Sequence, residues 1–542
     1  MKKKLLLPLL FASLFAVSSC GGSTTTSGDP ATTTTPTSTT EPETKTARKI
    51  LKASLEKDTV ECGYKTKVLC DVEGVTYRSD NTAIATVDAQ GNITTDEGGM
   101  AYITVSKEGY FDRVLKLFVD DYDTVDYLVE GFEFGPAIVG VKLNFPEKVK
   151  KADLQGKQFN VKTNRGNRTV SSVDLCDQEG QIINAEESRY VRISLETSYS
   201  GWGVENSAAC FTYANSKNSW ANNITAEVQL ANGQTLMAGD IEYDSSFKFN
   251  VIRSRISLST RDWGEAKSHT AEGYTLTYKD YQTDALREDG VLNPLIIWLH
   301  GMGEGGTDPD IALLGNDVTA LGEEKIQSHF VKGDQKGAYV LAAQTPTMWM
   351  NSGTGQINGG VGHSIYTKSL KSLIDNYIQE NGDIDTNRIY IGGCSNGGYM
   401  TMEMAVTYGD FFRAFYPCCE AYSDSFVTDE DVEKLKDLSM WFIHAANDTT
   451  VDPYGFTIPT YQRLMEAGGK DIHLSYFVDV RGVDCNPRGN NYQGHFSWIY
   501  IFRDEVEFDQ EDSENVAAPS TKAVKDAAGN NVNLFDWMEA MK

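Results

Sequence analysis

The chain of 542 residues has few basic residues, and this shortage excludes one class of partner. It contains 49 Lys and Arg against 76 Asp and Glu, so its formal net charge is −27. Nucleic-acid binding requires a basic face that neutralises phosphates. We therefore predict no nucleic-acid partner and interpret the acidic excess as a feature that keeps the protein soluble outside the cell.

Long apolar runs are equally scarce. Residues 5–17 form one such run behind the positive charges of residues 2–4, and this run is too short to span a bilayer comfortably. A short apolar run behind a basic start is typical of an export signal. Since no other stretch is apolar enough to cross a membrane, the sequence predicts that the rest of the chain folds in water.

Metal-site spacing is missing as well. No Cys-x-x-Cys occurs among the nine cysteines, and their spacing does not fit a zinc site. The stretch after residue 300 also lacks the G-x-x-x-x-G-K-S/T pattern of a phosphate-binding loop. We therefore expect neither a metal nor an organic cofactor.

Residues 17–20, Val-Ser-Ser-Cys, resemble a bacterial lipobox. The resemblance implies cleavage before Cys20 and lipid attachment to its thiol, so that residues 1–20 are a lipoprotein signal peptide. An ordinary signal peptide cut at small residues is the alternative. Residues 21–47 are mostly Thr, Ser, Pro and Gly, which predicts a flexible linker because such a segment cannot bury a core. Together these features predict an extracytoplasmic protein, anchored to a bacterial membrane through Cys20.

Two regions ahead of residue 266 predict small β-sandwiches. Residues 48–120 and 121–265 both alternate short β-rich runs with turns, a spacing typical of sandwich strands. The first region, through residues 75–105, resembles the bacterial Ig-like group 2 repeat, which implies a spacer or an adhesive domain. The second, through residues 129–136, resembles the Ig-like N-terminal domain of bacterial esterases.

The second of these regions shows no catalytic constellation, but it contains several tryptophans. Trp202, Trp220 and Trp263 are candidates for stacking on a sugar. A lone tryptophan more often lies in a core or in a contact between domains, and a fold by itself does not establish a binding function. Glycan binding by the sandwiches is therefore the less favoured interpretation.

From residue 266 onward the pattern changes to strands that alternate with helices, which predicts parallel βα units. Residues 294–299 are almost continuously apolar, as expected for a strand covered on both faces. Further strands are predicted at 337–342, 438–444 and 472–478, and helices at 366–379 and 460–467. The predicted architecture is two β-sandwich domains followed by an α/β domain, residues 266–542, with a mostly parallel sheet.

Residues 393–397 read Gly-Cys-Ser-Asn-Gly and match the pattern G-x-S-x-G. In a nucleophile elbow, the serine of this pattern occupies a strained turn between a strand and a helix. Ile389 and Ile391 predict the strand before the turn, and residues 399–404 predict the helix after it. Ser395 is therefore the predicted nucleophile. Cys394 leaves a cysteine nucleophile as an alternative, disfavoured because Ser395 holds the central position.

In enzymes with a nucleophile elbow, the three catalytic residues follow one another along the chain in the order Ser, then Asp, then His. This order selects the candidates for the acid and the base. Among the seven histidines, only His495 lies on a loop after the last predicted strand and before a final helix. Asp448 is the first acid after the strand at 438–444 and is our choice. Asp452 competes with it, and Asp479 is a more distant alternative.

A glycine-rich loop, residues 301–306, follows the apolar strand at 294–299. In the same layout, this loop and the residue after the nucleophile supply the backbone N–H groups of an oxyanion hole. By position these donors are Met302, with Gly301 as the alternative, and Asn396. The loop also matches G-x-G-x-x-G, but a dinucleotide site needs a helix that opens within the motif, and residues 307–310 delay any helix.

Four motifs in this order resemble the α/β-hydrolase superfamily, with closest likeness to esterases of the polyhydroxybutyrate-depolymerase and feruloyl-esterase type. They are residues 300–301, 385–400, 447–451 and 494–498. The resemblance implies a serine carboxylic-ester hydrolase that acts on acyl or feruloyl esters of cell-wall or plant polysaccharide. Trp349 and Trp498 are tentative substrate-binding residues.

Two other functions remain open. A prolyl-oligopeptidase-like peptidase would use the same triad, but nothing before residue 270 shows the repeat of a propeller. A surface binding lipoprotein with an inactive hydrolase domain is the second alternative. The intact Ser, Asp and His candidates argue against it.

Overall fold

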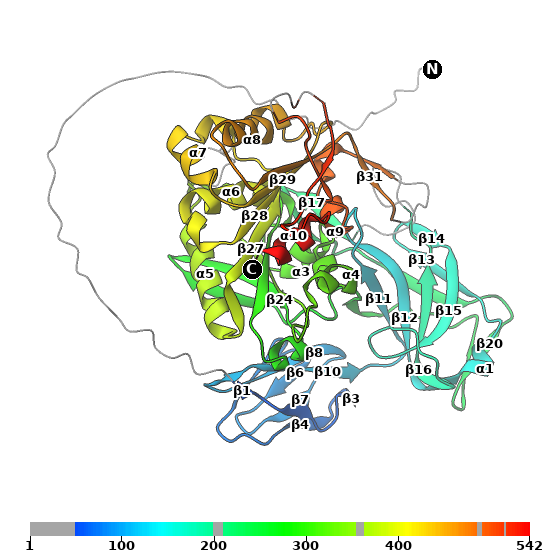
Figure 1. Cartoon of the computed structure of the whole chain (residues 1–542). Helices are drawn as coiled ribbons and strands as arrows, with labels where there is room; N and C mark the ends of the chain where they lie inside the picture. The colour runs from blue at the N-terminus through cyan, green and yellow to red at the C-terminus, as the bar shows by residue number, and fades with distance from the viewer. Residues whose placement is uncertain are drawn as a thin grey trace, which may run out of the picture. The chain divides into compact units, whose positions relative to one another are not determined.

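The chain folds as β-structure followed by an alternation of strands and helices (Figure 1). The computed structural model describes residues 49–198, 210–353, 363–484, 490–513, 516 and 518–541. The predicted signal peptide, the predicted lipidation site Cys20, the predicted linker and Trp202 lie outside the described residues. Among the helices that are described, none is both long and apolar enough to cross a membrane.

The first β-sandwich consists of two four-stranded sheets, with strand orders β3-β10-β8-β5 and β2-β4-β7-β6. Along β4 (Lys65–Cys70) buried side chains alternate with exposed ones, because one face of the strand meets the core and the other meets solvent. Side chains of both sheets share one apolar core that includes Val68, Ile93, Ile103 and Leu117. The other strands are β2 (Ala53–Leu55), β3 (Thr59–Glu61), β5 (Thr76–Ser79), β6 (Ala85–Val87), β7 (Asn92–Thr95), β8 (Gly99–Ser106) and β10 (Arg113–Asp120).

The second β-sandwich packs a seven-stranded sheet against a three-stranded one. The larger sheet has the order β15-β16-β12-β11-β22 with β20 and β21 attached, and the smaller has the order β14-β13-β19. Val141 and Val191 of the larger sheet share a core with Val161 and Val228 of the smaller. The strands are β11 (Thr124–Glu130), β12 (Ala137–Lys150), β13 (Phe159–Thr163), β14 (Gly166–Arg168), β15 (Val170–Cys176), β16 (Glu187–Leu195), β19 (Ala226–Leu230), β20 (Thr235–Ala238), β21 (Ile241–Asp244) and β22 (Ile252–Ser257). A separate hairpin pairs β17 (Phe211–Ala214) with β18 (Lys217–Trp220).

An eight-stranded sheet forms the centre of the last part of the chain. Its order is β23-β24-β26-β25-β27-β28-β29-β30. From β26 to β30 every neighbouring pair is parallel, whereas β23 and β24 form an antiparallel edge. The strands are β23 (Lys267–Ala271), β24 (Tyr274–Tyr281), β25 (Asn293–Leu299), β26 (Tyr339–Gln344), β27 (Ile384–Cys394), β28 (Ala414–Cys418), β29 (Met440–Ala445) and β30 (Ile472–Phe477).

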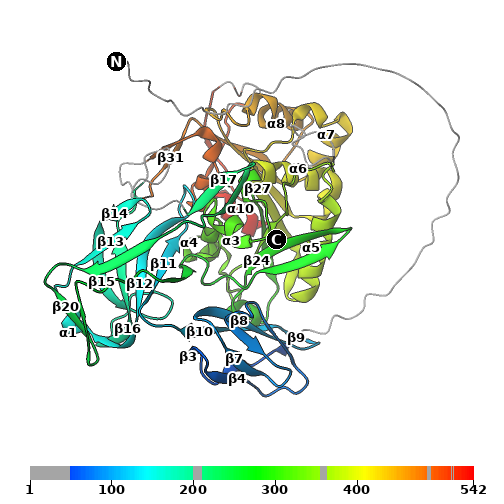
Figure 2. The same cartoon turned by 180° about the vertical axis from the view of Figure 1, so that it is seen from behind.

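Helices cover both faces of this sheet (Figures 1 and 2). Alternate residues of β25 point to opposite faces, so Ile297 joins one apolar cluster and Ile296 the other. The first cluster takes in α5 (Thr367–Glu380), α6 (Asn396–Tyr408), α7 (Asp429–Leu435) and α8 (Thr457–Glu466). The second takes in α3 (Pro309–Leu314), α4 (Glu324–Gln327), α9 (Ile499–Phe502) and α10 (Leu534–Ala540). The sheet is therefore the middle layer of three, as its continuously apolar strands predict.

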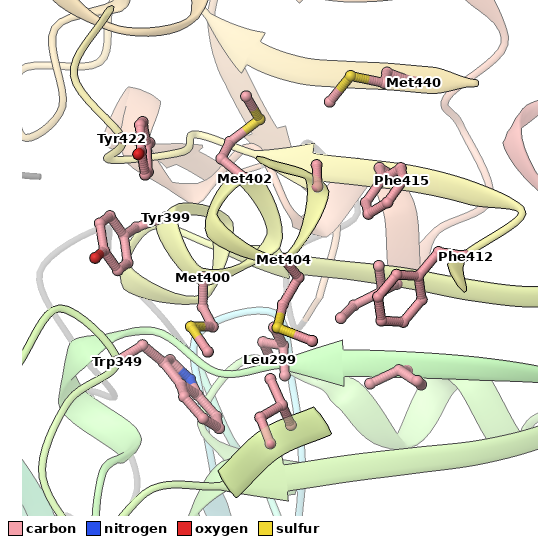
Figure 3. Packing of buried hydrophobic residues seen from close by; sticks show 14 of the residues in the cluster. Leu299, Trp349, Tyr399, Met400, Met402, Met404, Phe412, Phe415, Tyr422 and Met440 are labelled. Carbon is pink, nitrogen blue, oxygen red and sulfur yellow. The ribbon is translucent and has the colours of Figure 1, made fainter. Parts of the chain in front are cut away.

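Helix α6 follows the predicted nucleophile and is buried on more than one side. Met400 and Met404 lie four residues apart and share one side of the helix, while Met402 points the other way, toward Met440 (Figure 3). All three α6 methionines have no exposed surface. A helix that is apolar on several sides is stable only inside a core, so α6 holds the residue before it in a fixed place.

The predicted fold class is confirmed: Ig-like β-sandwiches precede an α/β domain with a largely parallel sheet. The strands predicted at 294–299, 337–342, 438–444 and 472–478 and the helices predicted at 366–379 and 460–467 begin and end within three residues of the observed ones, whereas α6 extends four residues beyond the predicted 399–404. The sequence analysis missed a hairpin close to the predicted base, formed by β31 (Val480–Gly482) and β32 (Asn490–Tyr492). Its strands have three residues each and carry no run that stands out in the sequence.

We predict that Met404→Ala lowers the free energy of unfolding of the α/β domain by about 2–5 kcal/mol, because the lost methylenes leave a cavity in a closed core. Guanidinium denaturation followed by tryptophan fluorescence measures this change. Leu292→Ala is the control, since that side chain is 53% exposed and its loss should change the free energy by less than about 0.5 kcal/mol. Equal effects of the two substitutions would contradict the packing described for α6.

Candidate active site

Ser395 lies at a sharp turn between the end of β27 and the start of α6. Its φ of 55° and ψ of −111° put it in a strained region for a residue with a side chain. A Cβ atom on either Gly393 or Gly397 would overlap the carbonyl oxygen of Leu299, so both positions require glycine. The turn is fixed by two backbone hydrogen bonds of 2.9 Å, from the Ser395 N–H to Cys418 and from the Tyr399 N–H to Ser395.

His495 and Asp448 are joined by a hydrogen bond of 2.8 Å between Nδ1 and Oδ2. Asp448 follows β29 in a loop, and His495 lies in a single 3-10 turn, Gly494–Phe496. The other oxygen of Asp448, Oδ1, accepts hydrogen bonds from the backbone N–H groups of Thr450 at 2.8 Å and Val451 at 3.0 Å. The carboxylate is therefore held from two directions in a buried site.

The two rival acids lie elsewhere. The Asp452 side chain accepts a hydrogen bond from the Tyr454 N–H at 3.1 Å and caps the short helix that follows it. Asp479 pairs with Arg481 at 2.8 Å in an exposed position. Among the described residues, Asp448 is thus the acid that contacts His495.

The serine and the histidine approach the same end of the sheet but are not hydrogen-bonded to each other. Ser395 is partly exposed, and its hydroxyl makes no hydrogen bond to any residue in the described ranges. His495 lies beside Cys419, the residue after the Cys418 carbonyl that binds Ser395; the Cys419 sulfur, a His495 nitrogen and an Asp448 oxygen all lie within 4.8 Å of one another. In free enzymes the bond between nucleophile and base is often long and tightens only with substrate.

Burial and charge act in opposite directions at this pair. Burial alone would raise the pKa of Asp448, but hydrogen bonds from His444 and His495 more than offset it and hold that pKa well below its usual range. Burial would lower the pKa of His495, but the neighbouring Cys419 sulfur and the Asp448 carboxylate raise that pKa above its ordinary value. Since Nδ1 donates to Asp448, Nε2 is the nitrogen left to accept a proton.

The predicted oxyanion donors are both first residues of helical segments. Met302 opens a 3-10 turn, Met302–Glu304, and Asn396 opens α6. The first backbone N–H groups of a helix have no acceptor within that helix and are available to an anion. The Asn396 side chain also accepts a hydrogen bond of 2.6 Å from the Trp349 N–H, which ties the segment after β26 to the elbow.

His300, directly before the glycine-rich loop at residues 301–306, has a structural role. Burial lowers its pKa to about 4, so the ring is neutral. Its Nε2 accepts a hydrogen bond of 3.2 Å from the Thr345 N–H, which leaves Nδ1 to donate to the Gly301 carbonyl at 2.5 Å. The ring thereby fixes the path of the loop as it leaves β25.

The two tentative substrate-binding tryptophans are packed inside the domain. Trp349 has no exposed surface, and its ring lies 5.3 Å from that of His300. Trp498 is 5% exposed and meets the His495 ring edge-on at 5.7 Å. This burial favours a structural role for both, with Trp498 bracing the base, and their contact with substrate stays a prediction.

A hairpin of the second sandwich reaches the glycine-rich loop at residues 301–306, a contact that no sequence pattern predicted. Asn218 of β18 donates to the Glu304 carboxylate at 3.2 Å, and Asn316 donates to its other oxygen at 3.2 Å. Glu304 is buried beside Met302, and this burial raises the pKa of Glu304 to about 7. No local pattern identifies this contact, because Asn218 and Glu304 are 86 residues apart.

Two of the tryptophans considered for sugar stacking have other partners. The Trp220 indole N–H donates to Asp308 at 2.7 Å, and the Arg255 guanidinium lies 3.4 Å above its ring. Trp220 therefore joins the second sandwich to the α/β domain. Trp263 is 3% exposed and packs against Tyr281.

We predict that the His495 imidazole titrates above its ordinary value of about 6.5 and that Asp448→Asn lowers its pKa, because the neutral amide no longer stabilises the imidazolium. Histidine C2–H resonances recorded against pH measure this, with His495→Gln used to assign the signal. Asp452→Asn is the matched control and should leave the His495 titration unchanged. A larger shift in the Asp452 variant would show that the wrong acid has been paired with His495.

Comparisons with known proteins agree with this architecture. Residues 288–479 match the Phospholipase/Carboxylesterase family model, and residues 124–237 match the esterase Ig-like N-terminal domain. Residues 73–108 match the intimin immunoglobulin-like domain. An Ig-like first sandwich is thereby supported, and its assignment to group 2 stays a prediction.

Two individual proteins extend the comparison. Poly(3-hydroxyalkanoate) depolymerase C of Paucimonas lemoignei is 40% identical over 169 residues, which cover 26% of this chain and 36% of that protein's length. The crystal structure of a thermostable esterase matches with a TM-score of 0.56 and 22% identity, over 70% of this chain and 96% of the other. The chain therefore has an α/β domain that is similar over residues 288–479 to the Phospholipase/Carboxylesterase model, and ahead of it an Ig-like module similar to the N-terminal domain of esterases.

Proposed function

We propose that this chain is a serine carboxylic-ester hydrolase in which Ser395 is the nucleophile, His495 the base and Asp448 the acid. The observation that carries the proposal is the buried hydrogen bond of 2.8 Å between His495 and Asp448, together with a serine on a strained elbow at the same end of the sheet. The match of residues 288–479 to the Phospholipase/Carboxylesterase model supports ester hydrolysis as the reaction.

The proposed reaction begins at the serine hydroxyl. A neutral hydroxyl is a weak nucleophile, so His495 Nε2 removes its proton while the oxygen attacks the ester carbonyl carbon. The imidazolium that forms is stabilised by Asp448 and then protonates the leaving alcohol. Water next attacks the acyl-enzyme with His495 again as base, which releases the acid and restores Ser395. The cycle needs no group beyond these side chains and water.

Charge on the carbonyl oxygen is the second requirement. In the tetrahedral intermediate this oxygen becomes an anion, and the Met302 and Asn396 backbone N–H groups are the proposed donors. One such donor contributes about 3–4 kcal/mol to the barrier reduction in a well-studied protease. The positive end of α6, which begins at Asn396, adds to this stabilisation.

Specific features argue against the two alternatives. The described residues ahead of the α/β domain form sandwiches, whereas a prolyl-oligopeptidase carries a propeller of repeated blades. An inactive binding protein would not need a strained serine or a buried Asp–His pair, because backbone strain and burial of charge both cost stability and are typical of functional sites.

The proposal extends to substrate, location and domain division. We take the substrate to be an acyl or feruloyl ester of polysaccharide, and the protein to be held at a bacterial membrane by lipid on Cys20. The division that fits this reading is signal peptide 1–20, linker 21–47, Ig-like domains 48–120 and 121–265, and catalytic domain 266–542. The Ig-like domains then act as spacers between the membrane and the catalytic site.

We predict that Ser395→Ala lowers the turnover of p-nitrophenyl acetate by at least about 10³-fold, since the variant lacks the attacking oxygen. Circular dichroism should show the fold unchanged. Cys394→Ala is the control, because it removes the neighbouring thiol and leaves the hydroxyl in place. Turnover that survives in the Ser395 variant and disappears in the Cys394 variant would assign the reaction to the cysteine.

A panel of acetyl, butyryl, octanoyl and feruloyl esters, run with a peptide panel, tests the substrate. We expect hydrolysis of esters and none of the peptides. Cleavage of the peptides at rates that match the esters would favour the peptidase.

We predict that Cys20→Ala abolishes labelling of the protein by a fatty-acid analogue in cells and releases it from the membrane fraction, because the lipid is attached to that thiol. Immunoblots of membrane and released fractions measure the change. Cys62→Ala, which alters an exposed cysteine, is the control and should stay lipidated. Membrane retention in both variants would contradict the anchor.

A further inference from the structure

A second histidine lies behind the predicted acid. His444 is near the end of β29 and has no exposed surface. Its Nε2 is 3.1 Å from Asp448 Oδ2 and 3.1 Å from the Val451 carbonyl oxygen. Both partners are acceptors, so Nε2 must carry the proton and donate to them. Because His444 lies within a strand, it does not have the loop position that is expected of the catalytic base.

The other nitrogen of His444 belongs to a series of buried polar groups that are joined by hydrogen bonds. Nδ1 lies 2.8 Å from the hydroxyl of Thr457, the first residue of α8. That hydroxyl lies 3.0 Å from Glu420 Oε1, and Glu420 Oε2 accepts a hydrogen bond of 2.7 Å from the Tyr422 N–H. Glu420 and Thr457 have no exposed surface. The series thus runs from Glu420 to Thr457, His444, Asp448 and finally His495.

Two arrangements of the protons fit these contacts, because the Thr457 hydroxyl has a single proton to donate. If it donates to Glu420, that carboxylate is ionised and His444 must be an imidazolium. If Glu420 is protonated and donates to the hydroxyl, the hydroxyl donates to a neutral His444. The total charge is the same, but the second arrangement buries two neutral groups in place of two charged ones, so it is the favoured one.

The surroundings of Glu420 agree with the neutral form. Burial raises the pKa of Glu420 to about 8, and the repulsion from Asp424 acts in the same direction. Asp424 itself pairs with Arg463 at 3.0 Å. The raised pKa favours the protonated form of Glu420, and in that form Glu420 donates to the Thr457 hydroxyl.

We propose that Glu420, Thr457 and His444 form a donor chain that positions the Asp448 carboxylate, which makes His444 a positioning residue for the acid. This inference rests on the proposed triad. His444 and His495 donate to one oxygen of Asp448, and two backbone N–H groups donate to the other. The carboxylate cannot rotate without losing a donor, and it stays ionised in a buried site.

The Thr457 hydroxyl also selects the tautomer of His444. With the hydroxyl present, Nδ1 accepts and the proton stays on Nε2, where Asp448 needs it. Without the hydroxyl, the proton can move to Nδ1, and the Nε2 lone pair then faces the Asp448 carboxylate and the Val451 carbonyl. That arrangement is repulsive, so Asp448 would shift away from the position that serves His495.

The test compares three substitutions in α8. Thr457→Val should lower kcat for p-nitrophenyl acetate by about 10- to 100-fold with KM little changed, because displacement of a catalytic group by a fraction of an ångström has effects of this size. Thr457→Ser keeps the hydroxyl and should restore most of the loss. Thr460→Val is the matched control: it removes another buried hydroxyl of α8, bonded to Asp424 at 3.0 Å, and should leave kcat unchanged.

A second pair of substitutions, at Glu420, tests the first donor of the donor chain. Its outcome does not depend on whether the Thr457→Val variant folds. Glu420→Leu should lower kcat as Thr457→Val does. Glu420→Gln should recover most of that loss, because its amide N–H can donate to Thr457 while its carbonyl accepts from the Tyr422 N–H. Loss of kcat in Glu420→Gln as severe as in Glu420→Leu would overturn the donor chain.

The Ser395→Ala variant, measured in the same assay, distinguishes failure of the proposed triad from failure of the donor chain. If that variant keeps its turnover, the triad itself is wrong. If it loses turnover while Thr457→Val behaves like Thr460→Val, the triad stands and the donor chain is wrong. Loss in Thr457→Val with recovery in Thr457→Ser supports both.

Discussion

The carboxylate of Asp448 is the group on which the candidate site depends, because it accepts four hydrogen bonds, three from residues within four positions of it and one from His495, 47 positions away. Two come from the backbone of its own loop, one from His444 at the end of β29 and one from His495. A buried anion is strongly unfavourable unless it is paired and hydrogen-bonded. The loop after β29, the turn that carries His495 and the start of α8 must therefore all be in place before this carboxylate can be buried.

The elbow sets a steric constraint that complements this electrostatic one. The turn at Ser395 brings Gly393 and Gly397 against the Leu299 carbonyl, so β25, β27 and α6 approach closely only where both residues lack a Cβ atom. Burial of the methionine-rich helix α6 offsets the strain at Ser395 (Figure 3). Met302 follows β25 and Asn396 follows β27, so the two residues lie at the same end of the parallel sheet. Sterics thus position the predicted nucleophile, and hydrogen bonds position the predicted base and acid.

Local patterns predicted much of this structure. The apolar run at 294–299 and the alternation of strands and helices predicted the three-layer domain, and G-x-S-x-G predicted a turn at Ser395. What the patterns could not predict are contacts between distant residues. Glu420, Thr457 and His444 are brought together by β28, α8 and β29, and Asn218 meets Glu304 only because one hairpin of a sandwich lies against another domain's loop. Local patterns also do not reveal that Trp349 is fully buried or that the Arg255 guanidinium lies over the Trp220 ring.

The sequence by itself determined the order of domains, the elbow and the candidate residues Ser395, Asp448 and His495, because periodicity, glycine spacing and chain order are local properties. It left Asp448 and Asp452 as competitors, since both follow the same strand and lie only four residues from each other. Only the tertiary structure brought one of them to His495 and left the other as a helix cap. The physical reason is that a hydrogen bond depends on distance and direction in space, and residues 47 positions apart acquire these only when the sheet has formed.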